Sequence, residues 1–193
     1  MGLTAATAAA TASVTDAEIR LHLHIDAGDG SALVNTYINT AEDYCQRFQN
    51  RAYIEQIWYL TLDSFPVGNF IAIPLPPLMS VSSVTYYGTG GTANTMASGT
   101  TYIVDTYSEP GRVSLAYGES WPVIDFRPVN AVKIKFTAGY GSASSSVPTF
   151  VKQAIKLLVG HWYEHREDTD IKLLENIPAG ADSLLTFERI WPI

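Results

Sequence analysis

The chain has 193 residues, enough for one domain with a sizeable core or one domain with a large insertion. Its net charge of −7 is spread evenly, with no basic segment, which argues against a sequence-independent grip on nucleic-acid phosphates. Charged residues make up only 16% of the chain, against about 25% in typical soluble domains. A surface poor in charge is easier to bury against neighbours, so composition leaves a monomer and a self-associating protein equally open.

The N-terminal residues 1–14 have neither a basic region nor a strong apolar run, so they do not resemble a signal peptide. We expect them to form a mobile arm. No stretch of the chain approaches the roughly 18 apolar residues that a membrane helix needs. The single cysteine, Cys45, excludes an internal disulfide and lies on the apolar stripe of a predicted helix, where we expect a small buried hydrophobe.

Two helices are predicted between residues 15 and 51. Thr15 and Glu18 have the spacing of a capping box, which starts the first helix, although the alternating run 19–25 leaves a strand as the alternative. Ser31 suits the cap of the second helix, whose apolar residues recur every three or four positions over about five turns. Those apolar residues are Leu33, Val34, Tyr37, Ile38, Ala41, Cys45 and Phe48.

From residue 53 to residue 138 the apolar period changes from 3.6 to 2, which predicts β-strands. Turn-forming Gly, Pro and Asn residues separate the apolar runs. Short strands at this spacing favour an antiparallel sheet, a sandwich or a small barrel. The predicted strands cover residues 57–62, 70–73, 81–87, 102–104, 112–115 and 131–136.

The period returns to 3.6 after Pro148, which suits the first position of a third helix. Residues 167–183 are acidic and turn-rich, and a short helix is expected over 182–187. The pattern predicts an α+β fold, a helical bundle of two N-terminal helices and a C-terminal helix with a large inserted antiparallel β-sheet. We expect one domain over residues 15–166, with the β insert at 53–138 and a C-terminal extension at 167–193.

Candidate chemistry is sparse. His161 and His165 are four residues apart on one helical face, but no third His or Cys ligand is indicated except His22 and His24. A helix end that favours partly charged histidine is therefore the better interpretation. Gly139-Tyr-Gly141 lacks the third glycine of a dinucleotide fingerprint and reads as a turn that requires positive φ. No catalytic residue, metal site or cofactor is predicted, and an enzyme is not expected.

Five residues form a candidate subunit interface. The turn Glu109-Pro110-Gly111-Arg112 predicts type II geometry, with its Glu and Arg placed to pair across it. Trp121 lies in a Gly-Glu-Ser-Trp-Pro loop and is either core or an interface anchor, because interface hot spots favour Trp. Lys133 and Lys135 alternate with apolar residues, so they face solvent or a neighbouring subunit.

An ordered set of short motifs covers residues 15–165. It includes AExYC from Ala41, RAxI from Arg51, IxLPPL from Ile73, SVxSVxYY from Ser80 and FTAGYG from Phe136. Between them and after them come EPGR, SWP, RP, NAV and HWYE. In this order the motifs resemble the head–tail connector (adaptor, or head completion) proteins of tailed phages. The arm and the last 25 residues match less clearly.

The resemblance implies a virion structural protein, a ring of usually twelve copies beneath the portal that joins the filled head to the tail. It implies as partners the chain itself, the portal protein and a stopper or tail-completion protein. DNA would pass through the lumen without sequence-specific binding, no membrane is involved, and the site would be the virion neck after assembly in the host cytoplasm. Other neck or tail modules, such as a tail terminator or a baseplate component, and a small hydrolase remain as alternatives.

The C-terminal residues 184–193 contain five large apolar side chains close to the end of the chain. Burying one such side chain contributes about 1.5–3 kcal/mol, so the segment is expected either to fold back on the third helix or to dock on a partner. Resembling adaptors place such segments against the portal, which favours docking, with Trp191 as the anchor. The candidate docking residues are Leu185, Phe187, Arg189, Ile190, Trp191 and Ile193.

Overall fold

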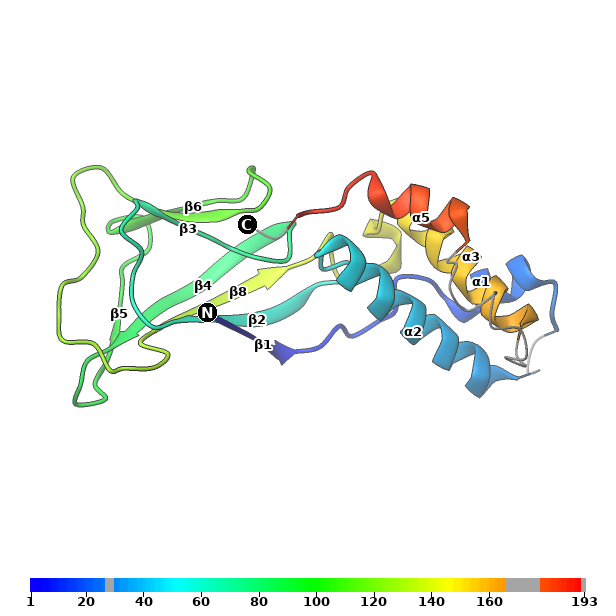
Figure 1. The fold of residues 1–193 in the computed structure, drawn as a ribbon, viewed down its shortest axis with the longest axis horizontal. Coiled ribbons are helices and arrows are strands. Elements are labelled where there is room, and N and C mark those ends of the chain that lie inside the picture. Colours follow the sequence, from blue (N-terminus) through cyan, green and yellow to red (C-terminus); the bar gives the residue numbers. More distant parts are fainter. Residues whose placement is uncertain (27–29, 166–177, 192–193) are drawn as a thin grey trace. The chain divides into compact units, whose positions relative to one another are not determined.

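The computed structural model describes residues 1–26, 30–165 and 178–191, and its chain forms two compact units (Figure 1). We call them the β unit (Met1–Ala9 and Glu55–Tyr140) and the helical unit (Ala10–Ile54 and Gly141–Ile193). The α+β class and the antiparallel pairing predicted from the sequence are confirmed, and neither sheet closes into a barrel within the described residues. The finer division into an arm, one domain and an extension stays a prediction.

Two antiparallel sheets make up the β unit. The larger has the order β1-β2-β8-β4-β5 and the smaller the order β3-β7-β6. All six predicted strands are present, and β1 and β5 are additional. The strands are β1 (Gly2–Thr7), β2 (Gln56–Leu62), β3 (Phe70–Ala72), β4 (Leu78–Tyr87), β5 (Ala93–Thr95), β6 (Tyr102–Asp105), β7 (Arg112–Leu115) and β8 (Val132–Ala138).

The core of the larger sheet follows from its register. Leu60, Ile134 and Val84 lie side by side across β2, β8 and β4, and all three are fully buried. The opposite face of β8 carries Lys133 and Lys135, as the alternation predicted. One face of this sheet therefore holds the core, and the other carries the lysines.

Residues 2–7 form a strand that the sequence analysis did not predict. This strand, β1, pairs with β2 from Gly2 opposite Thr61 to Thr7 opposite Ile57. The sequence GLTAAT gives no clear alternation of apolar and polar residues, and five of its six residues stay exposed. A strand that buries so little has little reason to show a burial pattern, so the periodicity contained no signal for it.

The helical unit contains four described α-helices and a short 3₁₀ turn. The capping box at Thr15 and Glu18 is confirmed, so the strand alternative for residues 19–25 is wrong. Gly30, rather than Ser31, is the N-cap of the second helix, and Pro148 is an N-cap rather than the first helical residue. The elements are α1 (Asp16–Leu23), α2 (Ser31–Gln49), η1 (Ser144–Ser146), α3 (Thr149–Glu164) and α5 (Ala179–Thr186).

Helices α2, α3 and α5 enclose the apolar core of this unit. Ile38, Ala41 and Cys45 of α2 are buried, as their spacing predicted, and so are Ile155 and Leu158 of α3. Burial, together with the neighbouring Glu42 carboxylate, raises the pKa of the Cys45 thiol to about 12. Cys45 is therefore a packed, unreactive thiol at neutral pH.

Helix α1 is attached to α3 by a charged contact. The Lys152 ammonium lies 2.7 Å from a Glu18 carboxylate oxygen, and the Lys156 ammonium lies 3.9 Å from it. Partial burial acts to raise the pKa of Glu18, but hydrogen bonds from Lys152 and Thr15 outweigh it and lower the pKa to about 2. No helix among the described residues is long and apolar enough to cross a lipid bilayer.

Candidate functional site

The C-terminal segment packs back onto the helical unit through Leu185. This residue lies in the last turn of α5 and is completely buried, although the sequence analysis placed it among the docking residues. Ala181, one turn earlier, is also buried. The fold-back alternative therefore describes α5, and Leu185 is an internal anchor of the segment.

The backbone after Leu185 is held by the end of α2. The side-chain amide of Gln49 donates to the main-chain carbonyl of Leu185 at 2.8 Å, and the main-chain amide of Ile190 donates to the main-chain carbonyl of Gln49 at 3.0 Å. The side-chain amide of Asn50 donates to the main-chain carbonyl of Ile190 at 2.7 Å, and Arg51 Nε donates to the main-chain carbonyl of Glu188 at 2.7 Å. We call these four hydrogen bonds the C-terminal clasp. Because they use main-chain groups of residues 185–190, they fix the course of the segment.

Sequence reasoning did not find the clasp. Gln49 is fully buried, and its side-chain oxygen accepts a hydrogen bond from the Tyr53 hydroxyl at 2.6 Å. The only sequence signal for the clasp is the position of Gln49 at the end of the apolar stripe of α2. A glutamine buried there needs a hydrogen-bond partner, because buried polar groups are normally paired. Which partner it finds, 136 residues away, is a matter of tertiary structure.

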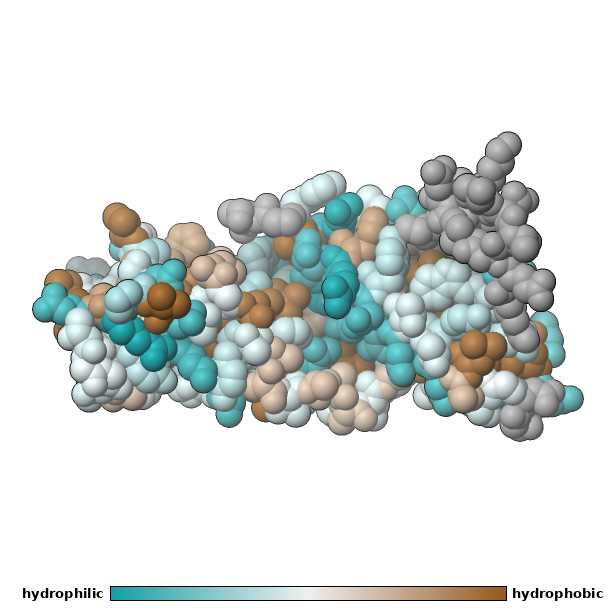
Figure 2. Space-filling model, turned by 60° about the horizontal axis from the view of Figure 1, so that its bottom comes forward, coloured by the Kyte–Doolittle hydropathy of each residue, from teal (hydrophilic) through white to brown (hydrophobic). Residues whose placement is uncertain are grey.

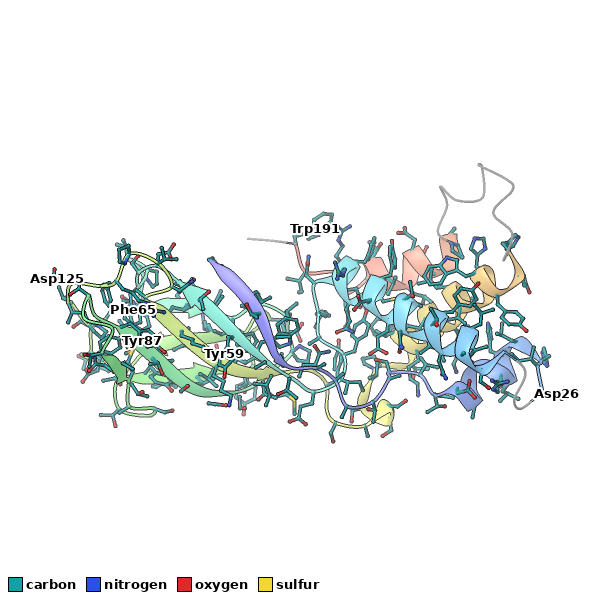
Figure 3. All side chains as sticks on the ribbon, turned by 90° about the horizontal axis from the view of Figure 1, so that it is seen from below. Asp26, Tyr59, Phe65, Tyr87, Asp125 and Trp191 are labelled. Carbon is teal, nitrogen blue, oxygen red and sulfur yellow. The ribbon has the colours of Figure 1, made fainter. Side chains whose placement is uncertain are left out.

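Two large side chains of the held segment remain exposed. Phe187 is 84% exposed and Trp191 is 67% exposed, and Figure 3 shows Trp191 at the surface of the helical unit. The Arg189 guanidinium lies 4.4 Å from the ring centroids of both Phe48 and Trp191. Its Nε is buried and has no hydrogen-bond partner among the described residues. Ile193, the last predicted docking residue, lies outside the described residues.

Trp121 of the candidate subunit interface belongs to an aromatic cluster in the β unit. Its ring stacks on Phe65 with centroids 4.9 Å apart and an interplanar angle of 8°, and its indole nitrogen donates to the Gly68 carbonyl at 2.7 Å. Phe126 and Tyr86 complete the cluster at edge-on angles. Trp121 therefore fixes two loops to each other, on which Val67, Tyr117 and Val123 are almost fully exposed.

The turn at Glu109–Arg112 is not type II, because Gly111 does not have the positive φ that this turn requires. Glycine is needed there for another reason, since a Cβ on Gly111 would lie 2.5 Å from the Cβ of Leu78. Arg112 Nε pairs with the Asp105 carboxylate at 2.9 Å. The Ser108 hydroxyl, with the backbone amides of Tyr107 and Ser108, lowers the pKa of Asp105 to about 2.

Lys133 and Lys135 lie on the same face of β8, as the alternation predicts. The Lys133 ammonium is 3.7 Å from the ring centroid of Tyr59, a cation–π contact that leaves the charge at the surface. All five candidate interface residues belong to the β unit, and all described docking residues belong to the helical unit. Neither set forms a constellation for catalysis.

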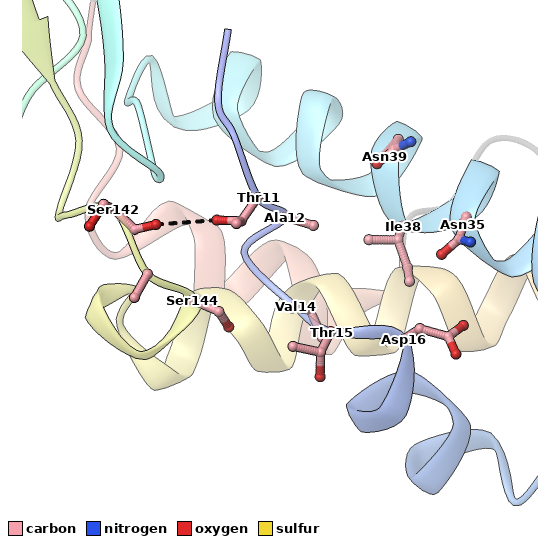
Figure 4. Close-up of a pocket in the computed structure, with 11 residues that line it drawn as sticks. Thr11, Ala12, Val14, Thr15, Asp16, Asn35, Ile38, Asn39, Ser142 and Ser144 are labelled. Atoms are coloured by element: carbon pink, nitrogen blue, oxygen red, sulfur yellow. Dashed lines mark hydrogen bonds between the residues drawn. The ribbon is translucent and has the colours of Figure 1, made fainter. Parts of the chain in front are cut away.

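An open cavity of about 640 Å³ lies in the helical unit between the start of α1, the middle of α2 and the turn before α3 (Figure 4). Thr11 Oγ1 donates to the Ser142 carbonyl across one end of it at 3.3 Å. The one ionisable side chain among its described lining residues, Asp16, is paired with Arg20 at 2.6 Å. A single paired carboxylate provides no acid–base couple, so the cavity does not indicate a reaction.

The histidine pair at the end of α3 is close but incomplete as a metal site. The rings of His161 and His165 are 4.7 Å apart, and within the described part of the chain no three His, Cys, Asp or Glu side chains are grouped to hold an ion. His165 Nδ1 lies 2.9 Å from the His161 carbonyl. Gly139 and Gly141 have positive φ, so the turn interpretation of this segment is confirmed.

Three solved structures match the chain over its full length. A chain in the neck of an empty gene transfer agent (GTA) particle, computed with C6 symmetry, has a TM-score of 0.80 and 26% identity. A chain in the neck of a native GTA particle, computed with C12 symmetry, has a TM-score of 0.79 and 25% identity. A chain in the virion of a native GTA particle has a TM-score of 0.81 and, at 24% identity, shares the fold. Each match covers 100% of this chain and 97% of the other.

No family model and no curated protein matches the sequence. The structural matches extend across both units, including β1 and the C-terminal segment, which the motif resemblance covered least clearly. The likeness is therefore one of the whole chain and not of a single common unit.

Proposed function

We propose that the chain is a structural protein of a phage-like virion and forms a ring in the neck between head and tail. The observation that carries the proposal is the full-length match to a chain of a GTA neck, with a TM-score of 0.80 at 26% identity. A related neck has been computed with C12 symmetry, so a ring of twelve copies is the expected assembly. The same fold at this identity and full coverage is best explained by the same place in a particle.

Within the neck, we assign the chain the part of an adaptor beneath the portal, assembled in the host cytoplasm. The portal on one side and a stopper or tail-completion protein on the other are its partners besides itself. The net charge of −7 suits a lumen through which DNA passes, because a lumen lined with basic residues would retain the duplex. Catalysis is not part of the proposed role.

The surface of the β unit supports assembly. Of the fifteen large apolar side chains that are exposed among the described residues, eleven belong to this unit. Val67, Tyr117 and Val123 are each more than 90% exposed, and Figure 2 shows apolar residues on its visible face. Apolar side chains gathered on one unit mark a surface that a partner covers.

The C-terminal segment is the proposed contact with the portal. Trp191 and Phe187 are its anchors, and Arg189 forms the polar rim beside Trp191. Leu185 and the backbone of Ile190 attach the segment to its own chain and do not contact the portal. The clasp thus presents two aromatic rings in a fixed position, which lowers the entropy lost on docking.

In the β unit, Glu109, Arg112, Trp121, Lys133 and Lys135 stay the proposed subunit interface. Trp121 acts there through the loops that it fixes, since its own ring is stacked on Phe65. Lys133 and Lys135 present positive charge on a β unit that has more acids than bases. A neighbouring copy with exposed acidic residues is a complementary surface for them.

Native mass spectrometry of the purified chain, alone and with its portal protein, tests the proposal. We expect a closed oligomer, twelvefold on the portal, and a stable complex of the two proteins. A chain that stays monomeric in both conditions would contradict the adaptor role. A chain that instead binds tail-tube protein and ignores the portal would be a tail terminator.

A further inference from the structure

The β unit contains a long segment without charge. Residues 64–104 include no Asp, Glu, Lys or Arg, and residues 1–15 include none either. Proteins normally protect exposed strand edges with charged side chains, prolines, bulges or a covering element, because an unprotected edge pairs with another chain. The two uncharged segments contain both edge strands of the five-stranded sheet, β1 and β5.

Each of these strands has a hydrogen-bonded neighbour on one side only. β1 pairs with β2 and β5 pairs with β4, and their outer edges end the sheet (Figure 1). Leu3 and Ala5 of β1 and Ala93 of β5 are exposed. β4, which extends past β5, carries register shifts at Leu78/Ser80 and Val81/Ser83, and such bulges blunt an edge. β1 keeps a regular register from Gly2 to Ala5 and has one register shift, between Ala5 and Thr7.

We infer that β1 of one copy pairs with β5 of the next copy, so that the five-stranded sheet continues from subunit to subunit. The inference rests on the proposed ring and adds a strand-to-strand contact to the interface proposed above. A ring needs two different complementary patches on each subunit, whereas a patch that binds itself stops at a dimer. The two opposite edges of one sheet are two different patches. When β1 of one copy pairs with β5 of the next, the contact is therefore head-to-tail.

The binding partner of each edge is a second copy of this chain, because neither edge carries charged side chains that would repel the other. Neither strand carries a charge, so no like charges meet across the new pair. Addition of a strand uses main-chain hydrogen bonds, which need no particular side chains. The smaller sheet is a poorer candidate because its edge strand β6 ends on a charged residue, Asp105, which is paired with Arg112.

Cross-linking of introduced cysteines tests the pairing. Cys45 is buried with a strongly raised pKa, so a maleimide reaches only new thiols. Within one copy β1 and β5 are four strand spacings, about 19 Å, apart, so a short bismaleimide links Ala5→Cys to Ala93→Cys only between copies. We expect the double variant to give a ladder of covalent multimers and each single variant to stay uncross-linked. Dimers from Ala5→Cys alone would show β1–β1 pairing and overturn the inference.

Charge at the same positions provides a second, matched test. The variant A5K/A93K places like charges on the two paired strands and should lower the fraction of ring at least tenfold in native mass spectrometry. The variant A5K/A93E places opposite charges there and should form rings like the wild type. If both variants form rings and the double cysteine variant gives no ladder, the β1–β5 interface is wrong while the ring stands. If the wild-type chain forms no ring even on the portal, the proposed function itself fails.

Discussion

Separate replacement of Leu185 and Trp191 by alanine should distinguish the two roles assigned to the C-terminal segment, which are stabilising the helical unit and binding the portal. Leu185 is completely buried, and a Leu→Ala change at such a site costs about 2–5 kcal/mol in the free energy of unfolding. For a chain of this size each kcal/mol corresponds to roughly 2–4 °C in Tm, so Leu185→Ala should lower Tm by about 4–20 °C. Trp191 is 67% exposed and would lose mainly its contact with Arg189, about 0.5–1 kcal/mol.

Thermal unfolding followed by circular dichroism gives the first quantity, and portal binding by analytical gel filtration gives the second. We expect Trp191→Ala to keep Tm within about 4 °C of the wild type and to lose portal binding. Leu21→Ala, a change at another exposed apolar residue of the helical unit, is the matched control and should alter neither quantity. The reasoning is refuted if Trp191→Ala binds the portal normally, or if it lowers Tm as much as Leu185→Ala does.

Three further changes test the internal structure. Because the pKa of Glu18 is lowered, its contact with Lys152 stabilises the fold above pH 4.5, and this contribution is lost as the pH falls towards 2. Glu18→Gln should therefore lower the free energy of unfolding by about 1–2 kcal/mol at neutral pH, after allowance for solvent screening. In urea titrations this difference from the wild type should shrink between pH 4.5 and pH 2. Glutamine preserves the capping box, and a difference that is constant with pH would contradict this account. Gly111→Ala should cost about 1–3 kcal/mol in urea unfolding, because its Cβ would overlap Leu78, and an unchanged urea midpoint would show that the overlap relaxes freely. Cys45 should react with a thiol reagent only at the rate of unfolding, and fast labelling of the folded protein would contradict its burial.

The elements that the sequence predicts well are those whose burial is local and periodic. The capping box at Thr15 forms within one helical turn, and the stripe from Val34 to Cys45 is visible in its spacing along one helix; both are confirmed. The six predicted strands each have one buried face or strong turn residues at their ends, and all six are present. These features repeat within a few residues, so one sequence is enough to detect them.

The features that the sequence does not predict depend on distant partners. β1 becomes a strand because β2 offers it an edge, and nothing in GLTAAT requires that outcome. The clasp joins Gln49 to Leu185 across 136 residues, and the choice between folding back and docking could not be made from the segment alone. The structure shows that the segment folds back and that Phe187 and Trp191 stay exposed, and docking on a partner stays a prediction.

The small share of charged residues in the chain left a monomer and an assembly equally open. These charged residues are scarcer in the β unit than in the helical unit. Only ten of the 31 charged residues of the sequence belong to the β unit, although it contains about half of the chain. They are Glu55, Asp63, Asp105, Glu109, Arg112, Glu119, Asp125, Arg127, Lys133 and Lys135. The same unit has most of the exposed large apolar side chains and both uncharged sheet edges. A monomer would gain nothing from gathering these features on one unit, whereas a ring needs two such surfaces on every copy, so the distribution favours assembly through the β unit.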